Sequence, residues 1–240
     1  MRLLASELLK IRTAPRTVVG LLLAELAIVA IGTASTIDSS NNPAPFEKPL
    51  LERDLIGAVG SSLLFALILG VLMITWEYRH GTITQTLLVT PVRERVIAAK
   101  LIVGGLAGAA LVVPALLLML VIAEIWVGDR LHFGLHELQL IGRVFLGAAI
   151  VAVLGVEIGA STARQLGAIV VAFAWVVFAE PALSIWGSLD SYLPIHAIDG
   201  VLGTGGEGSL SFGRGLLTIA VYIAALGALA LGLTRRRDIT

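Results

Sequence analysis

Long stretches without a charged side chain constrain this sequence more than any other feature. Leu55–Trp76 runs for 22 residues, Leu101–Ala123 for 23 and Gly215–Thr234 for 20 without one. An α-helix rises about 1.5 Å per residue, so each stretch can cross the hydrocarbon core of a bilayer, which is about 30 Å thick. The chain is 57% apolar, with a mean hydropathy of +0.95. A soluble domain of this size could not bury so many apolar side chains, and we predict a membrane protein.

Single ionisable residues interrupt three further apolar runs: Glu25 in Thr17–Ile37, Arg143 and Glu157 in Leu138–Thr162, and Glu180 in Gln165–Trp186. A membrane helix tolerates a carboxyl group that faces other helices or is protonated. The runs are continuous rather than alternating, which indicates helices and not strands. We therefore predict an all-α polytopic membrane protein, a single transmembrane domain over residues 1–240 with six spans at about residues 17–37, 55–76, 97–127, 138–162, 165–186 and 213–234.

Basic residues are unevenly divided between the two sides of this topology. Twelve of the 17 lysines and arginines fall on the side that holds both termini, and five fall on the other. Basic residues in short loops collect on the cytoplasmic side of a membrane. Both termini are therefore expected in the cytoplasm, with the protein in the plasma (cytoplasmic) membrane.

The N-terminal residues form an amphipathic pattern. Leu3, Leu4, Leu8 and Ile11 recur at helical spacing, and most of the polar residues lie elsewhere on the helix. Such a helix is suited to lie in the membrane interface before the first span. Pro15 is expected to end or bend it.

The segment between the second and third spans, residues 77–96, contains a short predicted helix. Thr82 and Gln85 have the spacing of a capping box, and Pro91 ends the element. A helix of about two turns is not stable alone, so its apolar face must dock onto something. It could pack on its own bundle, but the charged residues on both flanks favour a soluble partner. The members of the apolar face are Ile83, Leu87 and Leu88, and the flanking charged residues include Glu77, Arg79, Arg93 and Arg95.

Two segments are expected on the outer side. Residues 38–54 are rich in proline, asparagine and charge, which indicates an irregular loop. Residues 187–212 are half apolar, too polar to span and too apolar for a free loop. We expect short re-entrant or interfacial helices there.

The sequence contains only incomplete versions of known catalytic and ligand-binding motifs. Gly203–Gly208 reads G-x-G-x-x-G, but a dinucleotide site also needs a preceding strand and a following helix. His132 and His136 lack the glutamate of a metalloprotease helix, and without cysteine there is no thiolate or cysteine-based zinc site. We expect no catalytic residue, cofactor site or metal site. The zero net charge argues against a nucleic-acid partner.

Acidic residues inside the spans are candidates for function. Glu25, Glu157 and Glu180 cost free energy in a membrane unless they are paired, hydrated or neutral. They are predicted to mark a substrate pathway or a hinge. The alternative is that each bonds to backbone or serine, or lies at a helix end near water. Pro181 removes a backbone donor, so Glu180–Pro181 is the expected break in the fifth span.

Taken together, the N-terminal SELLKIR helix, the six spans and the segment EYRHGTITQTLLVTPVRERVIAAK resemble a permease subunit of the ABC-2 family of ATP-binding-cassette transporters. The resemblance implies that residues 77–91 include a coupling helix that docks into a separate ATPase subunit. It implies two ATPase copies, which bind ATP and magnesium, and a second permease copy or a paralogue. The expected docking residues are Glu77, Arg79, Thr82, Ile83, Leu87, Leu88, Arg93 and Arg95.

The resulting hypothesis is the permease subunit of an ABC transporter, an exporter of unknown substrate, and not an enzyme. Two alternatives stay open. One is a proton-coupled secondary transporter that uses the intramembrane glutamates. The other is a membrane anchor or assembly protein that transports nothing.

Overall fold

The structure is a computed structural model that describes residues 2–12, 15–40, 48–89, 92–128, 131, 133–187, 189–204 and 208–236. Within these residues it contains helices and no strands. The elements are α1 (Arg2–Arg12), α2 (Pro15–Ser40), α3 (Lys48–Val59), α4 (Ser62–Arg79), α5 (Thr82–Val89), α6 (Arg93–Val127), α7 (Leu135–Thr162), α8 (Gln165–Ala174), a π-helical turn (Trp175–Ala179), α9 (Glu180–Ser184), a 3-10 turn (Asp190–Tyr192), α10 (Pro194–Leu202) and α11 (Phe212–Arg236).

Six helical segments of the described chain are long and apolar enough to cross a membrane. They are Arg16–Asp38, Glu52–Arg79, Arg93–Val127, Leu135–Thr162, Gln165–Ser184 and Phe212–Thr234. The second combines α3 with α4, and the fifth combines α8, the π-helical turn and α9. This confirms the predicted all-α polytopic fold.

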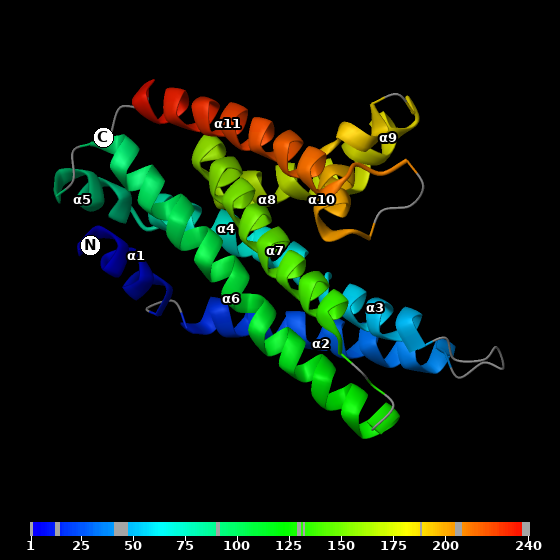
Figure 1. Cartoon of the computed structure of the whole chain (residues 1–240). Helices are drawn as coiled ribbons and strands as arrows, with labels where there is room; N and C mark the ends of the chain where they lie inside the picture. The colour runs from blue at the N-terminus through cyan, green and yellow to red at the C-terminus, as the bar shows by residue number, and fades with distance from the viewer. Residues whose placement is uncertain are drawn as a thin grey trace.

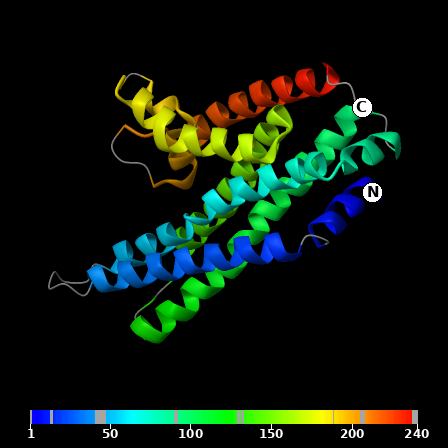
Figure 2. The same ribbon diagram turned by 180° about the vertical axis from the view of Figure 1, so that it is seen from behind.

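The two ends of the bundle differ. In both views α1, α5 and the C-terminal end of α11 lie at one end, which we call the terminal end (Figure 1 and Figure 2). The opposite end carries α3, the end of α6 and the start of α7 (Figure 1). The short helix α10 packs there against α11 and α7.

Glycines allow α4 and α7 to pack backbone to backbone at the centre of the bundle. A Cβ atom added to Gly70 would overlap the carbonyl oxygen of Ala152, and one added to Gly155 would overlap that of Leu67. Small residues that permit such close approach are typical of contacts between membrane helices. The helices α4 and α7 therefore make the most extensive contact in the bundle, and α6, α8 and α11 pack against α7.

A Gly155→Val variant is expected to unfold at a lower temperature than the wild type in detergent. The added side chain would meet backbone, which cannot move aside without separating the two helices, and overpacking typically costs about 1–3 kcal/mol. Gly142→Val, on the same helix with no atom within 4 Å of the added Cβ, is the matched control. Equal melting temperatures for the two variants would contradict this account of the α4–α7 contact.

The prediction of an irregular loop at residues 38–54 is wrong for those of its residues that the structure describes. Residues 38–40 complete α2, and Lys48–Val59 form α3. Pro49 lies in the first turn of α3, where a proline is tolerated because the backbone N–H has no partner there. Leu55 and Ile56 are buried and hold α3 against the core. Residues 41–47 lie outside the described residues.

Candidate functional site

The short helix α5 lies at the terminal end, between α4 and α6. Gly81 precedes it with a φ of +68°, a conformation that glycine adopts without steric cost, and the chain can therefore turn sharply out of α4. Thr90 and Pro91, the predicted end of the element, lie outside the described residues. α5 contacts both α4 and α6.

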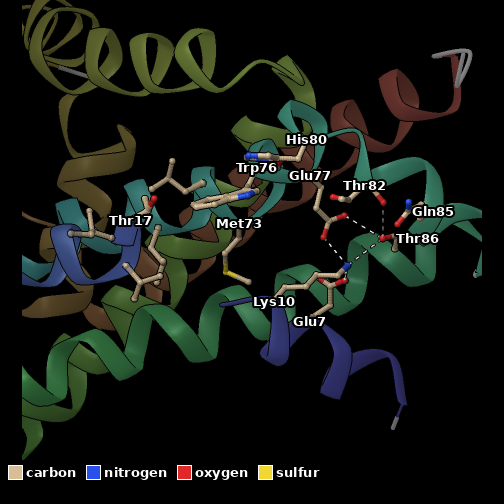
Figure 3. Close-up of a pocket in the computed structure, with 14 residues that line it drawn as sticks. Glu7, Lys10, Thr17, Met73, Trp76, Glu77, His80, Thr82, Gln85 and Thr86 are labelled. Carbon is tan, nitrogen blue, oxygen red and sulfur yellow. Dashed lines mark hydrogen bonds and ion pairs between the residues drawn. The ribbon is translucent and has the colours of Figure 1, made fainter. Parts of the chain in front are cut away.

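A ring of four charged side chains joins three helices beneath α5. Glu7 and Lys10 come from α1, Glu77 from the end of α4 and Lys100 from the start of α6. The Lys100 ammonium lies 2.7 Å from Glu7 Oε2 and 2.5 Å from Glu77 Oε1. The Lys10 ammonium lies 2.6 Å from Glu7 Oε1 and 2.7 Å from Glu77 Oε1. Each carboxylate is therefore bridged by both lysines; Figure 3 shows the part made by Glu7, Lys10 and Glu77.

The charges of this ring balance, two against two, and three of its four side chains are buried. Lys100 is 0% exposed and Glu77 is 4% exposed. Charges removed from water are stable only when they are paired and hydrogen-bonded. For Lys10, burial acts to lower the pKa, but the hydrogen bonds to Glu7 and Glu77 outweigh it and the pKa lies above its ordinary value. Lys10 therefore stays charged at physiological pH.

Thr86 connects α5 to the ring. Lys10 Nζ donates to Thr86 Oγ1 over 3.2 Å. The Thr86 hydroxyl lies 3.2 Å from the Thr82 carbonyl oxygen and 3.5 Å from Glu77 Oε2, so its one proton can go to either acceptor. Thr86 therefore links α5 to the ring and, through the ring, to α1, α4 and α6.

A pocket of about 450 Å³ adjoins the ring. Leu21 and Met73 belong to its apolar wall, and Glu77, Thr82 and Thr86 to its polar wall (Figure 3). The indole of Trp76 stacks on the imidazole of His80, with ring centroids 5.3 Å apart. α5 is thus held on this side by polar contacts with the ring, and it borders the pocket.

The predicted apolar docking residues lie on α5. Leu88 is 79% exposed, whereas Ile83 is half-buried. The side chain of Leu87 lies outside the described part. Thr82 lines the pocket, and Arg95 is exposed at the start of α6.

Three predicted polar docking residues have partners within the chain. Glu77 belongs to the ring. Arg79 donates to Gln165 Oε1 at the start of α8 over 3.0 Å. Arg93 donates to the Thr234 carbonyl oxygen near the end of α11. In this structure these side chains connect spans to one another at the terminal end.

Sequence reasoning missed Glu7, Lys10 and Lys100. One signal was present: Lys100 directly precedes an uncharged apolar run, where a lysine needs a partner. The partner itself could not be read, because Glu7 is 93 positions away.

A family model described as "ABC-2 family transporter protein" matches residues 3–179. The chain belongs to the ABC-2 family. Comparisons with curated proteins and with solved structures found no match. The matched residues include the whole charged ring and α5. As an ABC-2 protein, the chain is a membrane permease of an ABC transporter, and this family is generally a non-enzymatic transport subunit.

Two glutamates of the ABC-2 permease are buried inside spans. Glu25 of α2 lies close to the hydroxyl of Ser62 on α4. Glu157 of α7 lies against Gly227 of α11, where an added Cβ would come within 3.0 Å of Oε1. Each carboxyl group therefore sits at a different contact between helices. Their predicted role in a substrate pathway stays a prediction.

Glu180 of the ABC-2 permease holds α10 in place. Its Oε1 accepts from the backbone N–H groups of Ile195, over 2.5 Å, and His196, over 3.2 Å, in the first turn of α10. Its Oε2 accepts from Trp175 Nε1 over 2.8 Å. A carboxylate at a helix N-terminus satisfies donors that have no partner within the helix.

The expected break at Glu180–Pro181 takes the form of a π-helical turn one turn earlier. The Glu180 N–H donates to the Trp175 carbonyl oxygen, five residues back instead of four. This register accommodates Pro181, which has no N–H to donate. The fifth span continues through it to Ser184. The sequence motifs at His132 and in the middle of Gly203–Gly208 lie outside the described residues.

Proposed function

We propose that this ABC-2 permease exports a substrate across the plasma membrane and is driven by a separate ATPase subunit that docks on α5. The observation that carries the proposal is that α5 has an exposed apolar side chain and is also hydrogen-bonded to the charged ring. Leu88 is exposed on it, and Thr86 ties it to the charged ring. A short helix with such a surface and such a connection is suited to pass a force from a soluble partner to the spans.

The driving force is the difference in affinity with which the ATPase binds nucleotide in its two arrangements. Closure of the ATPase moves α5, and the ring passes this movement to α1, α4 and α6. α4 packs rigidly on α7 through the glycine contact, so the spans rock together, as in alternating access. The assembly contains two ATPase copies and a second permease copy or paralogue, with both chain termini in the cytoplasm.

Site-directed crosslinking tests this proposal. The chain has no cysteine, so a Leu88→Cys variant carries a single thiol for a photoactivatable maleimide. In native membranes we expect an ATP-sensitive adduct with a protein that contains a P-loop nucleotide-binding sequence. Leu135→Cys, at the exposed start of α7 at the opposite end, is the control and is expected to give no such adduct. Adducts of position 88 with lipid or its own chain alone would overturn the docking assignment.

A further inference from the structure

A second and larger cleft runs along the bundle, between α3–α4, α7, α8, α10 and α11. Its volume is about 670 Å³, within the range of about 300–1,000 Å³ that is usual for ligand sites. Apolar side chains from four spans form most of its wall, among them Leu67, Leu154, Val176 and Leu226.

The cleft is long. On α7 alone its lining extends from Leu140 to Ile158, eighteen positions that correspond to about 27 Å of helix. This is close to the thickness of the hydrocarbon core of a bilayer. A long apolar cleft of this kind matches an extended aliphatic chain better than a compact molecule.

The charged groups of the cleft gather at one end. Among the described residues that line it, Arg53 belongs to α3, which lies at the opposite end of the bundle (Figure 1), and Asp199 and Thr204 lie in α10 and directly after it. Arg53 donates to the Gly203 carbonyl oxygen over 2.9 Å, and the Thr204 hydroxyl lies 3.4 Å from Asp199 Oδ1. Burial raises the pKa of Asp199 above its ordinary value, although His196 and the hydrogen bond from Thr204 act to lower it. We call these three residues the polar rim; it offers both donors and acceptors.

Polar atoms deeper in the wall are satisfied within the chain. Trp175 Nε1 donates to Glu180, and the Tyr222 hydroxyl donates to the Tyr192 carbonyl oxygen over 3.2 Å. Both donors are therefore used within the chain, and the remaining lining of this part of the wall is mostly apolar.

We propose that this cleft binds the aliphatic chain of a membrane amphiphile, with the polar head of the amphiphile at the polar rim. Apolar walls over the length of a span, with charged groups at one end only, have the same polarity pattern as such a molecule. The inference concerns binding and does not depend on ATPase docking, because the cleft lies away from α5. A ligand in the cleft would also contact residues that hold α10 in place. Trp175 and Ile195 both line the cleft, and Glu180 binds the side chain of the first and the backbone of the second.

Photolabelling tests the proposal. The purified full-length chain is irradiated with a long-chain fatty acid that carries a diazirine at mid-chain, and labelled residues are mapped by mass spectrometry. We expect labelling of Leu154, which is buried, to exceed that of Leu117, which faces outward, and to be competed by the unlabelled fatty acid. Labelling of Leu154 at or below the level of Leu117 would overturn the proposal.

Two glycine variants show whether the label reports the cleft. Gly57 lines the cleft, and no atom lies within 4 Å of an added Cβ, so Gly57→Phe adds a bulky ring to the cleft from a position that is open at the Cβ. We expect it to lower Leu154 labelling several-fold, whereas Gly142→Phe, equally open but outside the cleft lining, leaves it unchanged. Equal labelling in both variants would contradict the assignment.

A disulfide test asks whether a second copy of the chain fills the cleft instead. If a Val171→Cys disulfide joins two copies and abolishes labelling, a second copy occupies the cleft and the proposal is overturned.

Discussion

A Lys100→Met variant is expected to lose much of the stability of the permease, because two buried carboxylates would share one remaining lysine. Removing one partner of a buried ion pair typically costs about 3–5 kcal/mol, since the other charge stays buried without compensation. Lys10 cannot replace Lys100, because it already contacts both Glu7 and Glu77. The measurement is the melting temperature of the detergent-solubilised chain, followed by tryptophan fluorescence.

Two further variants separate the charge effect from a simple packing defect. Lys10→Met removes a lysine that is 37% exposed, and we expect it to lower the melting temperature less. Glu7→Gln combined with Lys100→Met leaves one carboxylate and one lysine, so the double variant should melt at a higher temperature than Lys100→Met alone. If the two substitutions in the double variant lower the melting temperature additively, the ring is not the source of the stability.

The second large effect is expected on the association between the permease and its ATPase. Leu87→Asp together with Leu88→Asp should leave the permease folded and inserted but unable to bind its ATPase. Truncating an anchor residue at an interface costs about 2 kcal/mol or more, and two carboxylates in an apolar contact add a desolvation cost. Every 1.4 kcal/mol is about a tenfold change in affinity, so association should fall by on the order of a hundredfold or more.

Pull-down of the ATPase with tagged permease, and the ATPase rate in proteoliposomes, measure this effect. Leu88→Asp alone should also lower association strongly, because the side chain of Leu88 is 79% exposed. Leu135→Asp is the matched control, an exposed leucine at the opposite end. Unchanged association of the ATPase with the double variant would refute α5 as the docking helix.

The six membrane helices could be predicted from the chain alone, because an apolar run of twenty or more residues has few alternatives to a spanning helix. The short helix between the second and third spans could also be predicted. In the sequence Gly81 and Pro91 flank it, and its apolar residues recur at helical spacing. Such local signals depend only on neighbouring residues. The helix over residues 48–54 was missed because its polar composition is typical of a loop, although Pro49 was a signal for a helix start.

The charged ring, the backbone contact of Gly70 with α7 and the long cleft were decided by the tertiary structure. Hydropathy assigns a residue to a span but does not say which face of that helix meets which neighbour. Glu7 and Lys100 can be buried together only because the packing of α1 on α6 brings them to 2.7 Å. A buried charge is tolerated only where folding supplies its partner, and that partner can lie anywhere in the sequence.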